Sequence, residues 1–142
     1  MILTLSIATA ILSLCAALRW YLDRPERKKK LYLGGRVQLT ALWNDRAAFS
    51  LPIRRNLLVG TSVLALLAAL FHHRSSPVGV GLVLGGGVSN LLERLRGGRV
   101  YDYVRLPKAP WKLKKYVYNL ADFAVFFGLL AMVLRLGHRK NN

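Results

Sequence analysis

The stretches GGGVSNLLERLRGGRVYDYV (85–104) and YVYNLADFAVFFG (116–128) decide the fold of this chain, because in each an aspartate marks where a basic, aromatic loop meets an apolar run. The two aspartates are Asp102 and Asp122. A carboxylate beside a membrane is costly to desolvate, so it is usually paired or functional. Two adjacent carboxylates in a low-dielectric site cannot both ionise cheaply and tend to share one proton. One acid and one base then remain near neutral pH, which is what the activation of water against a peptide bond requires.

Charge and apolar residues are segregated along the chain. Its 142 residues are 54% hydrophobic, yet 22 Lys and Arg stand against 6 Asp and Glu, a net charge of +16. The loops hold the charge, and the apolar runs are residues 2–18, 56–71, 78–92 and 120–134. At ~1.5 Å per residue each run reaches roughly 23–26 Å, and flanking aromatic and arginine side chains extend it towards a ~30 Å hydrocarbon core.

These runs predict an all-α membrane protein with four transmembrane helices in a single domain, 1–142. The predicted spans are about 2–20, 56–73, 77–95 and 117–136. The first run has no basic stretch before it and no small-x-small cleavage site before Asp23, so we expect an uncleaved helix rather than a signal peptide. The single Cys15 excludes an internal disulfide and indicates a packing role.

Such a basic chain raises nucleic-acid binding as an alternative. The basic residues lie between apolar runs, however, where anionic membrane lipids account for them without a further partner. We therefore expect contact with anionic lipids and no nucleic acid. His72 and His73 are adjacent and point to different helix faces, and His138 is remote, so we expect no metal and no organic cofactor.

The loop between the first two runs predicts a small sheet resting on the membrane surface. Apolar residues alternate with others over 37–43, which is typical of a short strand, and Asn44 then begins a turn. In the third run, Gly79 and Gly81 indicate close helix packing. For residues 85–87, packing and room for a substrate remain equal alternatives.

Helical spacing groups the polar residues of the two opening stretches. Asn119 and Asp122 are three apart and share a helix face. A face of the third run likewise carries Asn90, Glu93 and Arg94, and the intervening loop delivers Asp102.

Each of these residues has a role that its chemistry suggests. Asp102 and Asp122 share a proton and bind the attacking water, and sequence does not decide which is the base. Asn90 and Asn119 orient the carboxylates or hold substrate backbone. Arg94 forms a structural ion pair with Glu93 or contacts a loop carbonyl. For Asn44, capping the sheet and contacting a peptide are alternatives, and for Asp122 alone helix capping would be sufficient.

Four motifs in this order resemble lipoprotein signal peptidase, the type II signal peptidase of bacteria. They read NDRAAF (44–49), GGVSNLLER (86–94), GRVYDY (98–103) and YNLADFAVFFG (118–128), and they span roughly residues 37–130. The resemblance implies a membrane aspartyl endopeptidase with four helices and Asp102 and Asp122 as the catalytic pair. Its substrates would be lipidated prolipoproteins, cleaved before a lipid-modified cysteine, and we expect a monomer.

Three residues depart from the family's pattern. Glu93 replaces an aspartate, Ser89 a glycine, and Arg46 stands where a glycine is usual. These departures support an alternative, a catalytically degenerate relative that binds lipopeptides or acts as a membrane scaffold.

The family resemblance and the charge bias predict opposite topologies. The resemblance implies a bacterial plasma-membrane protein whose site lies at the outer face and whose termini are cytoplasmic. Most of the 22 Lys and Arg residues lie in the two loops that would then be outside, 19–55 and 94–119. The positive-inside rule alone would place those loops in the cytoplasm. We expect the outer location, with the loops folded against anionic lipid.

Overall fold

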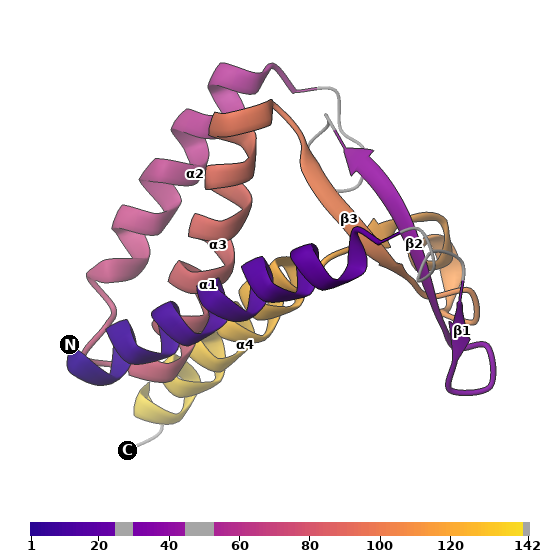
Figure 1. Ribbon diagram of the computed structural model, residues 1–142. Coiled ribbons are helices and arrows are strands. Elements are labelled where there is room, and N and C mark those ends of the chain that lie inside the picture. The colour runs from indigo at the N-terminus through magenta and orange to yellow at the C-terminus, as the bar shows by residue number, and fades with distance from the viewer. Residues whose placement is uncertain (25–29, 45–52, 141–142) are drawn as a thin grey trace.

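The computed structural model describes residues 1–24, 30–44 and 53–140 and contains helices with a small antiparallel sheet at one end (Figure 1). Most of the NDRAAF motif, including Arg46, lies outside the described residues. The elements are α1 (Ile2–Leu22), β1 (Leu31–Tyr32), β2 (Val37–Asn44), α2 (Arg55–Leu70), α3 (Pro77–Gly97), β3 (Val100–Arg105), the 3-10 helix η3 (Trp111–Lys115), β4 (Val117–Tyr118) and α4 (Leu120–Lys140).

The α3 helix is the centre of the helical part, in contact with α1, α2 and α4. Glycines allow these close approaches. A Cβ atom on Gly85 would lie 2.7 Å from the Ala8 carbonyl oxygen of α1, and one on Gly86 would lie 2.5 Å from the Ala121 carbonyl oxygen of α4. A Cβ on Gly87 would meet Leu66 of α2 at 2.6 Å. All three glycines therefore serve helix packing, which decides between the two alternatives for residues 85–87.

The C-terminus of α3 is fixed to the start of α2. Gly98 ends the helix in the left-handed conformation, with φ of +71°, which a glycine adopts without steric cost. The Arg55 guanidinium donates hydrogen bonds to the carbonyl oxygens of Arg94, at 2.8 Å, and Leu95, at 3.0 Å. The Arg94 carbonyl also accepts from the Gly98 N–H, so the Arg55 guanidinium adds a second bond there and supplies a partner for Leu95 at the helix end.

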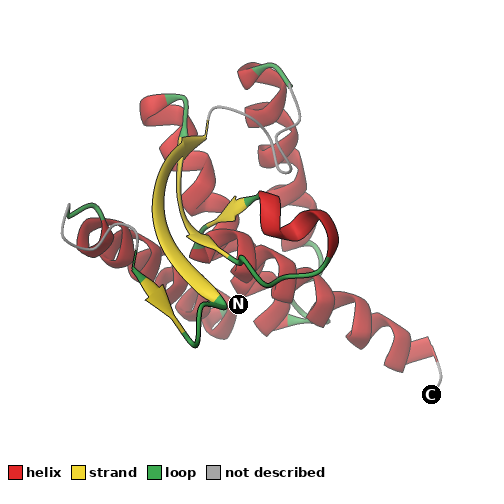
Figure 2. Cartoon of the chain, turned by 90° about the vertical axis from the view of Figure 1, so that its right-hand side faces the viewer, coloured by secondary structure: helices red, strands yellow, loops and turns green. Residues whose placement is uncertain are grey.

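The sheet is larger than the sequence predicted. The strand over 37–43 is confirmed as part of β2, but the sheet is not confined to the loop between the first two helices. Its strand order is β1-β2-β3-β4, so half of it comes from the segment between α3 and α4. Asp102 therefore lies on a strand, opposite Leu42 of β2, and not in an irregular loop. Figure 2 views the molecule from the sheet side, with the strands in front of the helices.

Each predicted apolar run coincides with a helix of the described chain, with small shifts of boundary. The clearest difference is at the last one, where residues 117–118 form β4 and the helix begins at Leu120. Among the described helices, α1 alone is long and apolar enough to cross a membrane by length and composition, while α2 is apolar but has 16 residues. The described residues thus form four α-helices, and four membrane crossings stay a prediction.

Candidate active site

The first turn of α4 is built by a reciprocal pair of hydrogen bonds between Asn119 and Asp122. The Asn119 side-chain oxygen accepts from the Asp122 backbone N–H at 2.9 Å, and the Asp122 carboxylate accepts from the Asn119 backbone N–H at 3.0 Å. This is the geometry of a capping box. The Tyr103 hydroxyl accepts from the Leu120 N–H at 3.0 Å, so a further N–H of the first turn is satisfied. The capping role considered for Asp122 is confirmed.

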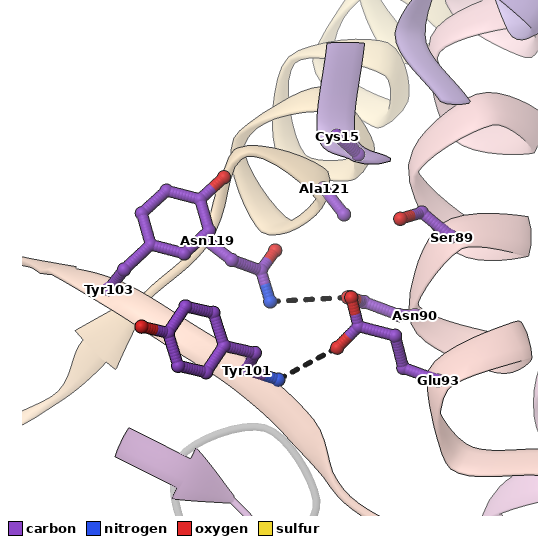
Figure 3. A pocket seen from close by; sticks show the side chains of 8 residues that line it. All are labelled: Cys15, Ser89, Asn90, Glu93, Tyr101, Tyr103, Asn119 and Ala121. Carbon is purple, nitrogen blue, oxygen red and sulfur yellow. Dashed lines mark hydrogen bonds between the residues drawn. The ribbon is translucent and has the colours of Figure 1, made fainter. Parts of the chain in front are cut away.

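The amide of Asn119 then connects the two aspartates. Its Nδ2 donates to Asp102 Oδ1 at 2.9 Å and to Asn90 Oδ1 at 3.2 Å. Asn90 Nδ2 donates in turn to Asp122 Oδ1 at 3.0 Å. Figure 3 shows the Asn119 and Asn90 side chains meeting between α4 and α3.

The far side of Asp102 is held by the sheet. Asn44, the last residue of β2, donates its Nδ2 to Asp102 Oδ2 at 3.0 Å. The structure thus brings together Asn44, Asn90, Asp102, Asn119 and Asp122, the polar cluster that the sequence predicted. Each carboxylate accepts two hydrogen bonds from neutral donors, which fix its orientation without adding a formal charge.

Asp102 is almost entirely inaccessible, with 3% of its surface exposed. Burial is the main reason that the pKa of its carboxyl rises from the ordinary 3.8 to about 6. The charge of Asp122 raises this pKa further, which places the two carboxylates within electrostatic reach of each other. Hydrogen bonds from Asn44 and Asn119 and the charge of Arg94 oppose the rise.

Arg94 lies half-buried on α3, where its charge interacts with both Asp102 and Asp122. The ion pair predicted between Arg94 and Glu93 is replaced by a different one. The Glu93 carboxylate pairs instead with Arg19 of α1, at 3.3 Å. The charge of Arg94 therefore remains available to offset a negative charge on the aspartates.

A small cavity beside Asn90 and Asn119, with room for about one water molecule, is also lined by residues to which the sequence gave no site role. Tyr103 is buried and its hydroxyl binds the Leu120 N–H, a contact that no sequence pattern indicated. The remaining lining residues could be recognised only from the fold, because they come from α1, α3, β3 and the start of α4. The cavity is lined by Cys15, Ser89, Asn90, Glu93, Tyr101, Tyr103, Asn119 and Ala121 (Figure 3).

Comparisons with known proteins agree with one another. The family model described as signal peptidase (SPase) II matches residues 7–137. A lipoprotein signal peptidase of Methylobacterium sp. (strain 4-46) is 32% identical over 94% of this chain and 88% of its own length. One from Moorella thermoacetica is 34% identical over 73% of this chain and 71% of its own length.

Solved structures show the same fold. A bacterial membrane enzyme determined by the in meso method at 2.3 Å superposes with a TM-score of 0.82, covering 96% of this chain and 88% of that one at 14% identity. A second bacterial membrane enzyme, determined at 1.9 Å, gives a TM-score of 0.78 at 15% identity, covering 94% and 91%. At these identities the likeness establishes the fold and leaves the chemistry to be argued from the site.

Proposed function

This chain belongs to the signal peptidase II family, and we propose that it cleaves by an aspartyl mechanism at Asp102 and Asp122. Membership of the family makes it a protease that removes signal peptides from prolipoproteins. The observation that carries the proposal is the continuous hydrogen-bonded chain from Asn44 through Asp102, Asn119 and Asn90 to Asp122. It connects the two carboxylates through neutral amide groups.

The chemistry follows from one shared proton. The ionised carboxylate takes a proton from a water molecule, and the resulting nucleophile attacks the scissile carbonyl carbon. The protonated carboxyl donates its proton to the carbonyl oxygen as the tetrahedral intermediate forms. When the intermediate collapses, that carboxylate takes the proton back, and the carboxyl that received the proton of the water donates it to the departing amine. Because Asn119 and Asn90 are neutral donors, they do not force both carboxylates to ionise, as a lysine in their place would. Arg94 offsets the single negative charge that the pair retains.

We place the scissile bond directly before a lipid-modified cysteine of the substrate. The diacylglyceryl anchor holds that cysteine at the bilayer surface, and the site lies where the sheet meets the helix ends, so anchor and site would be at similar depth. The degenerate-relative alternative gains no support from Glu93, whose carboxylate is fully engaged.

The direct test is a gel-shift assay with purified protein and two prolipoproteins. We expect the diacylglyceryl-modified substrate to be cleaved and its unmodified cysteine-to-serine counterpart to remain intact, with no effect of a metal chelator. Equal cleavage of both substrates would contradict recognition of the lipid. Binding of the lipidated form without cleavage would favour the non-enzymatic alternative.

We also propose that the four helices cross the plasma membrane and that the sheet faces outwards. Large apolar side chains point out from the helices, among them Leu64 of α2 and Phe126 and Val133 of α4, each more than half exposed. Burial in lipid would remove this surface from water at ~25 cal/mol per Å². The turn between α2 and α3 lies near both termini, away from the sheet (Figure 1), so the termini would be cytoplasmic.

Cysteine labelling tests this topology. In a Cys15→Ser background, Lys112→Cys in η3 should react with an impermeant thiol reagent in intact cells, whereas Arg74→Cys should react only after permeabilisation. Both positions are exposed, so access to the reagent depends on the side of the membrane. The Cys15→Ser protein alone provides the unlabelled control, and the reverse pattern would show that the positive-inside rule had set the orientation.

Anionic lipid is the proposed partner of the basic loops. Trp111 is 89% exposed beside the exposed Lys112, Lys114 and Lys115. An aromatic with cations just before a membrane helix suits an anionic membrane interface. The site residues all come from one chain, so we propose that the protein acts as a monomer.

A further inference from the structure

Glu93 contacts two other elements from its position one turn after Asn90 on α3. Its Oε2 accepts a hydrogen bond from the backbone N–H of Tyr101, on β3, at 2.8 Å (Figure 3). Its Oε1 pairs with Nη1 of Arg19, on α1, at 3.3 Å. The Glu93 side chain is 15% exposed and that of Arg19 39%, so the pair is partly shielded from water. Both carboxylate oxygens are therefore used, and they join α1, α3 and β3.

The Tyr101 amide is next to the residue that carries the site. On one edge, β3 pairs with β2 through Val100, Tyr101 and Asp102. On the other edge, β4 pairs only with Val104 and Arg105. At Tyr101 the second edge has no strand beside it among the described residues, and Glu93 accepts the N–H that a strand would otherwise accept. A carboxylate acceptor makes this bond stronger than one to a neutral carbonyl.

We propose that Glu93, held by Arg19, is a positioning residue that fixes β3 so that Asp102 meets Asn119 and Asn44. The inference rests on the proposed aspartyl mechanism. One face of α3 then fixes the positions of both aspartates, because Asn90 donates a hydrogen bond to Asp122 and Glu93 holds the peptide next to Asp102. A displacement of about 1 Å at a reacting group can cost on the order of 10²-fold in rate, so this support affects turnover as well as stability.

The length of the Glu93 side chain matters for this positioning role. An aspartate at position 93, the residue of the family's pattern, is one methylene shorter and would not span Arg19 and the Tyr101 amide together without movement of a helix. Glu93→Asp should therefore lower kcat in this chain, although it restores the family's residue.

The experiment compares Glu93→Ala with Glu93→Gln on lipidated prolipoprotein, normalised to folded protein. The alanine removes both contacts, and kcat should fall about 10²-fold while KM changes less than about threefold. The glutamine keeps an oxygen for the Tyr101 N–H, so kcat should recover to within about tenfold of the parent. Arg96→Gln, at an exposed arginine of the same helix, is the matched control and should leave both constants unchanged.

A second pair of variants applies if Glu93→Ala does not fold. Arg19→Gln leaves the Glu93 charge without its ion pair and should lower kcat about tenfold. Adding Glu93→Gln to it should restore most of the loss. Parent-like kcat in Glu93→Ala or Arg19→Gln, no recovery in either glutamine rescue, or a rise in KM alone would overturn the positioning role. Loss of turnover in Asp102→Asn alongside such a result would leave the aspartyl mechanism standing, whereas an active Asp102→Asn would remove that mechanism itself.

Discussion

We expect Asp102→Asn and Asp122→Asn each to lower cleavage of a lipidated prolipoprotein by at least about 10³-fold, while the protein still folds and accumulates in the membrane. The reason is that one shared proton requires two carboxyl groups, and an amide can serve neither as the base nor as the acid. Asparagine keeps the volume of the side chain, so the surrounding network loses little packing. The measurement is single-turnover cleavage by purified variant, normalised to folded protein. Near-normal turnover in either variant would exclude the aspartyl mechanism.

The pH dependence of the parent provides an independent control for Asp102. Its pKa is about 6 in the folded protein and about 3.8 when unfolded, so its ionised form is disfavoured by folding. As pH falls through about 6 while Asp122 is ionised, Asp102 takes up the proton that the pair shares, so kcat/KM should rise and should decrease only at lower pH, where the remaining carboxylate is protonated too.

The raised pKa of Asp102 also makes a contribution to stability that depends on pH. It is fully present below the unfolded pKa and lost as pH rises through about 6, by at most about 3 kcal/mol. Thermal unfolding in detergent between pH 4 and pH 8 should show this step in the parent and not in Asp102→Asn. A step of equal size in both proteins would assign it to another group.

The part of the site that depends on helical spacing could be predicted from the sequence. Asn119 and Asp122 are three residues apart at the start of an apolar run, so their shared face and the capping bonds follow from local geometry. Asn90 is placed on its helix by the same periodicity.

The part that depends on strand pairing could not be predicted in this way. The sequence predicted that Asp102 lies close to Asp122, but in a loop. Asp102 lies instead on β3, because residues 100–105 pair with a strand about 60 positions earlier in the chain. Local patterns do not encode the register of such a pairing. The contacts of Glu93 could not be predicted for the same reason, because the backbone N–H that it binds becomes available only once β3 has formed. The sequence therefore predicted an ion pair between Glu93 and its neighbour Arg94, whereas in the structure Glu93 pairs with Arg19.

The glycines of α3 show a second limit of what the sequence alone predicts. Their spacing indicates close packing, but which helix each one faces depends on the arrangement of the bundle. Gly85 meets α1, Gly86 meets α4 and Gly87 meets α2, so three consecutive residues serve three interfaces. The contact at Gly86 brings α3 against Ala121, next to Asp122, which is how Asn90 comes within reach of that carboxylate.

Asn119 should be the most sensitive residue outside the aspartate pair, because one side chain caps α4 and joins the two carboxylates. It is 4% exposed, and its amide makes three side-chain hydrogen bonds, to Asp102, Asn90 and the Asp122 N–H. The two functions can be separated by the choice of substitution. Serine is a good N-cap but is too short and has no amide to reach Asp102.

We therefore expect Asn119→Ser to fold with near-parent thermal stability and to lose about 10²-fold in kcat, because Asp102 is no longer held. Asn119→Ala should lose the same activity and, in addition, about 0.5–2 kcal/mol of stability for the missing cap. Asn56→Ala, at an exposed asparagine of α2, is the matched control and should change neither. The measurements are kcat on lipidated prolipoprotein and thermal unfolding in detergent for the four proteins. Parent-like kcat in a folded Asn119→Ser would mean that the bridge to Asp102 is dispensable, and the role of Asn119 would then reduce to capping the helix that carries Asp122.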